Sequence, residues 1–213
     1  SYLNYMISII RLIRLKSWTK NLLCFAGLIF SGNLGNYNYL YSAFWLFISF
    51  SFISSSIYVF NDIIDKDSDS LHPKKKNRPL ASGKISVGIG YFVAIFFLTL
   101  GLFGSFKIGL VIFGFIIFYI INNIFYTFIL KKVPLLDVFS ISVGFLIRLV
   151  TGIYLVGENP TNWIVLCTMF LALFLGFAKR RAEIHSIGNR NEFKQRPVLK
   201  LYNKDFLDAL VNE

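Results

Sequence analysis

The chain has 213 residues, of which 55% are hydrophobic, 18% aromatic and only 15% charged. Soluble domains carry about 25% charged residues, so this composition argues against a soluble globular fold. The net charge of +11 is gathered in islands between long apolar runs, which favours contact with a membrane and with anionic phosphate groups, and argues against nucleic-acid binding.

The segment 1–16 is predicted to be an amphipathic helix at the membrane interface. Arg11 and Arg14 lie among apolar residues that recur at helical spacing. A helix with this pattern lies in the plane of the interface, with its apolar side in the lipid.

Six membrane-spanning helices are predicted after this segment, because each run approaches the ~20 apolar residues that cross the ~30 Å hydrocarbon core. They cover residues 17–31, 37–60, 86–104, 107–130, 134–156 and 160–178. The first run is short and contains Trp18 and Lys20 near its start. It is retained because it gives the chain a consistent topology.

The positions of Lys and Arg support this topology. With six spans, all but two of the 22 Lys and Arg fall on one side, the exceptions being Lys107 on the other side and Arg148 within a span. Such a bias places the basic loops in the cytosol. We therefore predict one all-α transmembrane bundle over 1–213, with an Asp-rich and basic cytosolic loop at 61–85 and a basic cytosolic segment at 179–213.

An acidic cluster, NDIIDKDSD, follows the second predicted span. Asp62, Asp65 and Asp69 recur at positions i, i+3 and i+7, so they share one face of a helix. Carboxylates placed in this way repel one another unless a cation lies between them, and hard oxygen ligands suit Mg²⁺. We predict a Mg²⁺ site at these aspartates, with Asn61 as a further oxygen donor and Asp67 in solvent. The alternative is a charged helix end in water.

A basic loop, LHPKKKNRPLASGK, comes next in the chain. Its Lys and Arg side chains are suited to phosphate oxygens, and Arg78 can form two parallel bonds with such a group. Arg78 precedes Pro79, which predicts a turn that holds the guanidinium near the carboxylates. For the three lysines before it, an ordinary positively charged loop is an equal alternative.

Ionisable residues interrupt the fifth predicted span. Asp137 and Arg148 are eleven residues apart, so they face the same side of a helix at about 16 Å from each other. Such residues are costly in a membrane and usually face a cavity. Asp137 is a candidate to complete the metal and sugar site, and Arg148 has either a structural role or one toward the lipid substrate. Tyr126, on the fourth span, is a candidate for a substrate contact or for packing.

NDIIDKDSD followed by NRPLASG resembles the UbiA-type superfamily of intramembrane prenyltransferases, whose first signature is N-D-x-x-D-x-x-x-D. Within it, the decaprenyl-phosphate phosphoribosyltransferase group is the most similar. This closer resemblance is carried by RLKSWTKN at 14–21, YTFILKKVPLLD at 126–137, GFLIR at 144–148 and AKRRAE at 178–183. The resemblance implies a bundle of roughly nine spans, so with six the chain is expected to be incomplete.

The resemblance also implies a Mg²⁺-dependent enzyme of the bacterial plasma membrane with its site facing the cytosol. The implied reaction transfers 5-phosphoribosyl from phosphoribosyl diphosphate to a polyprenyl phosphate and releases diphosphate. The implied catalytic residues are Asp62, Asp65, Asp69 and Asp137, the first three as metal ligands. The implied substrate-binding residues are Lys20, Asn61, Arg78, Tyr126, Lys131, Arg148, Lys179, Arg180 and Glu183.

The loop after the sixth span departs from the members that use prenyl diphosphates. Those members resemble each other in having a second acidic motif there, whereas this chain has Lys179, Arg180 and Arg181 before Glu183. A cationic patch accepts phosphate directly, as a lipid monophosphate or a sugar 5-phosphate would require. Two alternatives stay open: a UbiA-type prenyltransferase that moves a polyprenyl group from its diphosphate to an aromatic acceptor, and a lipid or phosphate carrier without catalytic activity.

Overall fold

The computed structural model describes residues 2–73, 75–186, 202 and 207–209, and every regular element in this part of the chain is a helix. Five of these helices are long and apolar enough to cross a membrane. They are α3 (Tyr37–Ile64), α5 (Val87–Ile108), α6 (Leu110–Phe128), α7 (Leu136–Leu155) and α8 (Asn162–Ser186). They confirm the all-α class and the five longer predicted spans.

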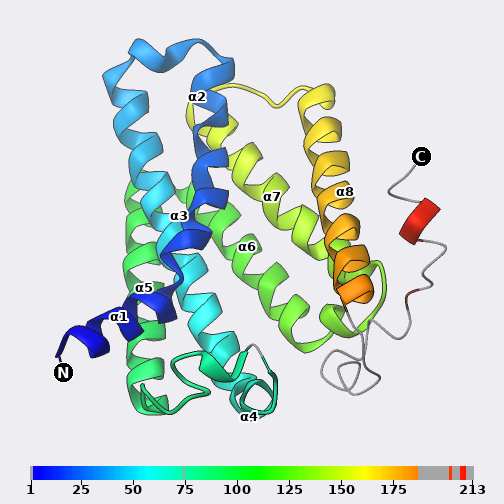
Figure 1. Ribbon diagram of the computed structural model, residues 1–213. Helices are drawn as coiled ribbons and strands as arrows, with labels where there is room; N and C mark the ends of the chain where they lie inside the picture. Colours follow the sequence, from blue (N-terminus) through cyan, green and yellow to red (C-terminus); the bar gives the residue numbers. More distant parts are fainter. Residues whose placement is uncertain (1, 74, 187–201, 203–206, 210–213) are drawn as a thin grey trace.

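Helices α3 and α7 form the centre of the bundle. In the most apolar stretch of each, 56% of the residues are buried, against 22% in α5 and α6 and 11% in α8. Helix α3 packs along α5, and α7 packs between α6 and α8 (Figure 1). The outer helices leave large apolar side chains exposed, among them Phe92, Leu110 and Phe170. These side chains are suited to contact with lipid.

The first predicted span differs in structure from the others. Most of it lies in a 3₁₀ helix, η1 (Leu15–Phe25), followed by the short helix α2 (Ala26–Phe30). A 3₁₀ helix rises about 2.0 Å per residue, against about 1.5 Å in an α-helix. The segment therefore extends about 30 Å, enough for the hydrocarbon core, whereas one α-helix of the same length would extend about 24 Å. Figure 1 shows it running beside α3.

Buried serines of α3 hold η1 in this conformation. Ser51 accepts a hydrogen bond from the Asn21 amide (3.0 Å), and Ser55 accepts one from Trp18 Nε1 (2.9 Å) and donates to the carbonyl of Ile13 (2.7 Å). Buried polar groups are costly without partners, and among the described residues every buried side-chain nitrogen and oxygen has one. Because 3₁₀ helices longer than a few residues are uncommon, these contacts explain why this one persists.

Helix α7 approaches the first segment closely enough for their backbones to touch. Gly27 of α2 lies against Gly152 of α7, and Gly152 in turn lies against the backbone of Cys24 in η1. Small residues permit this approach between membrane helices, where packing and hydrogen bonds drive association.

The segments rich in Lys and Arg gather at one end of the bundle, which we call the basic end (Figure 1). They include α1 (Tyr2–Ile13), α4 (Lys66–Ser70), η3 (Lys75–Asn77), η4 (Leu130–Lys132) and the last turns of α8. The short η2 (Asn33–Gly35) lies at the other end. This arrangement agrees with the separation of charge in the sequence.

Three predicted boundaries change. The predicted interfacial segment 1–16 is α-helical only to Ile13, because Arg14 has a left-handed backbone with φ of 52°, and its last two residues belong to η1. The predicted loop 61–85 begins as helix, since α3 continues to Ile64 and α4 follows. The predicted segment 179–213 begins as the last turns of α8. Residues 187–201, 203–206 and 210–213 lie outside the described residues.

Substitution of Gly152 by alanine is expected to lower the melting temperature of the purified protein. The added Cβ would lie within 3.0 Å of three backbone atoms of Cys24, so α7 and η1 must separate, at a cost of about 1–3 kcal/mol. Gly114→Ala in α6 is the matched control, because nothing lies within 4 Å of the Cβ added there. Equal melting temperatures for the two variants would contradict the close approach.

Candidate functional site

The acidic cluster lies where α3 passes into α4. Asp62 is in the last turn of α3, Asp65 joins the two helices and Asp69 is in α4. The backbone keeps a helical course here, because Asp65 N–H donates to the Asn61 carbonyl and Asp69 N–H donates to the Asp65 carbonyl. Asp62 and Asp69 are buried, at 4% and 2% exposed, and Asp65 is partly exposed. Asp67 is exposed, as predicted.

Arg78 lies between the two buried carboxylates. Its Nη1 donates to Asp62 Oδ1 at 3.0 Å and to Asp69 Oδ2 at 2.5 Å. Arg14 donates from Nη2 to the same Asp62 oxygen at 2.5 Å, and Lys75 Nζ lies 3.5 Å from Asp69 Oδ1. Buried carboxylates in such proximity require cations between them, so the cluster is held together by positive charge.

The turn after Arg78 is fixed by buried contacts. The Ile85 N–H donates to the Pro79 carbonyl at 3.1 Å, the Ser82 N–H donates to the Arg78 carbonyl at 2.9 Å, and Leu80 is fully buried. Arg78 is thus placed beside the carboxylates as the Arg-Pro sequence predicts. The guanidinium lies in a rigid turn at the basic end.

Asp65 points to a different partner. Its Oδ1 lies 3.1 Å from Lys131 Nζ, which comes from η4 after α6. One turn earlier, the Asn61 amide oxygen accepts a hydrogen bond of 2.7 Å from Thr127 Oγ1 of α6. The end of α3 is therefore tied to the end of α6. In the described part of the chain, no three His, Cys, Asp or Glu side chains converge as a ligand set, so the three aspartates do not meet at one point.

Asp137 lies in a second charged cluster, between α7 and α8. It is fully buried, and Arg180, at 2% exposed, donates from Nε to Asp137 Oδ2 at 2.7 Å and from Nη1 to Glu183 Oε2 at 2.9 Å. Tyr202 donates to Asp137 Oδ1 at 2.5 Å. Burial, together with this bond to Asp137, raises the pKa of Tyr202, which keeps its hydroxyl protonated as a donor. Both Asp137 oxygens therefore have partners in this structure.

Arg148 lies in the interior of the bundle, at 4% exposed. It donates to Asn21 Oδ1 at 2.6 Å, to the Gly144 carbonyl at 2.6 Å and to Tyr119 Oη at 2.7 Å, and it faces the Tyr119 ring at 4.5 Å. These partners are neutral, and no ion pair among the described residues involves Arg148. Arg148 and Asp137, predicted on one face of α7, are both buried but bind different neighbours.

The other predicted substrate-binding residues lie around these clusters. Lys20 and Lys179 are exposed, and the charges of Lys179, Arg148 and Arg14 all act on Lys20. Tyr126 is half-buried and within electrostatic reach of Arg180. Cations of η1, α7 and α8 therefore act on one another, and Arg14 among them binds Asp62 of the acidic cluster.

Three residues that bind the predicted site residues are not among those predicted from the sequence. Arg14 binds Asp62, Thr127 binds Asn61 and Tyr202 binds Asp137. Arg14 could have been identified from the sequence, because it is the first residue of the segment 14–21 that carries the family resemblance. The other two have no such signal, since each contact joins residues more than sixty positions apart.

Comparison with known proteins gives matches that cover most of the chain. The UbiA prenyltransferase family matches residues 21–189. Decaprenyl-phosphate phosphoribosyltransferase of Corynebacterium glutamicum is 32% identical over 93% of this chain and 60% of its own length. That of Mycolicibacterium smegmatis is 31% identical over 96% of this chain and 65% of its own length. The chain thus spans less than two thirds of these relatives.

A solved structure shares the fold. It is a UbiA homologue from Archaeoglobus fulgidus bound to DMAPP and Mg²⁺, with a TM-score of 0.76 and 22% identity, covering 95% of this chain and 72% of the homologue. The extent of the family match, the identity to the curated relatives and the shared arrangement of helices agree. This chain belongs to the UbiA prenyltransferase family.

Proposed function

We propose that this chain carries the site of a phosphoribosyltransferase that moves 5-phosphoribosyl from phosphoribosyl diphosphate to a polyprenyl phosphate and releases diphosphate. The basic end would face the cytosol of a bacterium, following the positive-inside rule. The observation that carries the proposal is the convergence of Asp62 and Asp69 on one cationic nitrogen of Arg78. The identity of 32% and 31% to the two curated phosphoribosyltransferases supports the choice of substrates.

The residues at this cluster fit Mg²⁺. Two buried carboxylates already bind one positively charged nitrogen, so their oxygens point to a common place that a cation can take. Mg²⁺ is usually held by one or two carboxylates, with water and substrate phosphates as its remaining ligands. Asp62 and Asp69 would hold the ion, and Asp65, whose carboxylate lies against Lys131, would join them when that lysine moves to a substrate phosphate. Bound there, Mg²⁺ would draw negative charge from the diphosphate leaving group.

The protein's own cations would supply the remaining charge stabilisation. Arg78, Lys75 and Lys131 already lie against the aspartates, and each could pass to a phosphate oxygen when substrate enters. In the reaction, a lipid phosphate oxygen forms a bond to C1 of the ribose while the C1–O bond to diphosphate breaks, with its electron pair leaving on diphosphate. The attacking phosphate is already anionic, so no general base is required.

The lipid phosphate would meet the positive charge of Lys20, Arg148 and Lys179. Arg148 is buried with neutral partners, so its charge is available to an anion nearby. For Arg180 we propose a role other than direct substrate binding, because Asp137 and Glu183 neutralise its charge. We assign Asp137 and Glu183 as positioning residues that hold Arg180 between α7 and α8.

Donor choice tests the proposal directly. In vesicles containing polyprenyl phosphate, the purified protein is expected to move label from phosphoribosyl diphosphate to lipid with Mg²⁺ present, and to stop when EDTA removes the ion. Consumption of a prenyl diphosphate with an aromatic acceptor, and none of the sugar donor, would establish the prenyltransferase alternative. Binding of both without turnover would indicate a carrier.

Asp65→Asn is expected to lower turnover by about 100-fold or more, since it removes one charge at the predicted metal. Its side chain is partly exposed and its partner is a lysine on another element, so the fold should be retained. Asp67→Asn is the matched control, because Asp67 is exposed in the same segment. Turnover in Asp65→Asn equal to that of Asp67→Asn would rule out the metal role.

Arg148→Gln is expected to raise the KM for polyprenyl phosphate about tenfold, because a charge-assisted contact contributes about 1.5–3 kcal/mol. The KM for the sugar donor should stay unchanged. Arg148→Lys, which keeps the charge, should retain more of the lipid affinity than Arg148→Gln. A lower melting temperature with both KM values unchanged would instead give Arg148 a purely structural role.

A further inference from the structure

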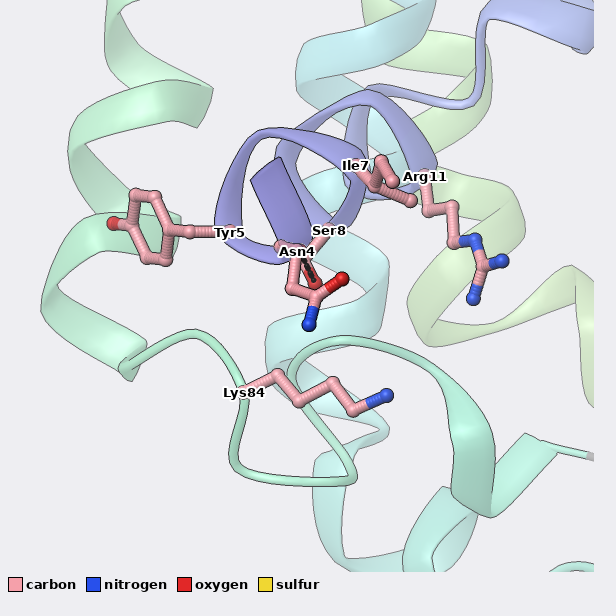
Figure 2. A pocket seen from close by; sticks show the side chains of 6 residues that line it. All are labelled: Asn4, Tyr5, Ile7, Ser8, Arg11 and Lys84. Carbon is pink, nitrogen blue, oxygen red and sulfur yellow. Dashed lines mark hydrogen bonds between the residues drawn. The ribbon is translucent and has the colours of Figure 1, made fainter. Parts of the chain in front are cut away.

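A cavity of about 430 Å³ lies between α1 and the loop that leads into α5 (Figure 2). It is lined by Asn4, Tyr5, Ile7, Ser8, Arg11 and Lys84. Figure 2 shows Asn4 and Arg11 pointing from α1 toward the loop, with Lys84 extended beneath them. This cavity takes no part in the proposed transfer reaction.

The three sides of α1 have different surroundings. Asn4, Ile7, Ser8 and Arg11, spaced three and four residues apart, form the side that faces the cavity. On another side, Leu12 is fully buried and packs with Ile9 and Ile13 in the core below α1. On the third side, Met6 and Ile10 are 59% and 47% exposed. The helix therefore has one side that is buried against the protein, one side with exposed apolar residues and one side that lines the cavity.

The cavity carries positive charge that no carboxylate of the described residues balances. Arg11 and Lys84 are exposed, and neither takes part in an ion pair with any described residue. Elsewhere at the basic end, Arg14, Lys75, Arg78 and Lys131 are each bound to a carboxylate, whereas the exposed Lys16 and Lys76, like Arg11 and Lys84, have no ion pair with a described residue. The two cations of the cavity are thus suited to an external anion.

The depth of α1 places the cavity at the level of lipid headgroups. Leu12 belongs to the same buried cluster as Val93, which lies about 9 Å into α5 from its first residue, Val87. Interfacial helices lie about 5–10 Å inside the headgroup boundary. Lys84 comes just before α5 begins, so in a membrane spanned by α5 the space between Lys84 and α1 would lie near the phosphate layer.

We propose that this cavity binds the headgroup of an anionic phospholipid. The guanidinium of Arg11 can form two parallel bonds with phosphodiester oxygens, and Lys84 can contact the same phosphate from the loop. The acyl chains would lie along the exposed apolar side chains of α1 and α5, among them Met6 and Phe92. The lipid would join α1 to the start of α5.

Titration of phosphatidylglycerol into the detergent-purified protein, followed by native mass spectrometry, tests the site. The wild-type protein should bind phosphatidylglycerol in preference to phosphatidylcholine. Arg11→Gln combined with Lys84→Gln should weaken this binding about tenfold or more, since two charge-assisted contacts are lost. Asn4→Trp, which fills the cavity without altering charge, should also displace the lipid, and melting temperatures check that each variant folds.

Lys16→Gln combined with Lys76→Gln is the matched control. Both residues are exposed, and the pair removes the same charge from outside the cavity. This control should bind phosphatidylglycerol within about twofold of wild type.

Equal weakening in the two pairs would show diffuse attraction to a basic surface, and competition by millimolar inorganic phosphate would show a site for soluble phosphate. Either result, or no preference for the anionic lipid, would overturn the proposal. Because binding is read without turnover, the result does not depend on the proposed reaction.

Discussion

The carboxylates of Asp62 and Asp69 are buried beside the same nitrogen of Arg78, and their joint burial as ions depends on that positive charge. The three residues come from α3, α4 and the turn that follows. Arg14 adds a second guanidinium from the junction of α1 and η1. The basic end therefore takes its shape from ion pairs between short segments, whereas the spans below it are organised by apolar packing. The ion pairs of the basic end thus lie apart from the apolar contacts that hold the spans together.

Polar groups inside the bundle also need partners, because burial of a polar group away from water is costly without a hydrogen bond. The serines of α3 meet Asn21, Trp18 and the carbonyl of Ile13, and Asn21 in turn orients Arg148. The same hydrogen bonds that stabilise a long 3₁₀ helix therefore also place a positive charge in the interior. These hydrogen bonds therefore serve both the fold and the proposed function.

The fold was largely predictable, because long apolar runs and the segregation of Lys and Arg identify spans and their common end. The 3₁₀ form of the first span was not, because its cause lies in tertiary contacts such as those of Ser51 with Asn21 and of Ser55 with Trp18. At the site, helical spacing identified Asp62 and Asp69 together, and the Arg-Pro turn placed Arg78. Spacing could not show that Asp65 turns to Lys131, because the lysine arrives from a helix distant in sequence.

Arg14 stands where the chain changes direction, with a left-handed backbone between α1 and η1. Its side chain grips Asp62 while its backbone joins the two segments. A displacement of α1 relative to α3 would therefore change the contact between Arg14 and Asp62. One residue therefore links the orientation of α1 to the position of a buried carboxylate in the acidic cluster.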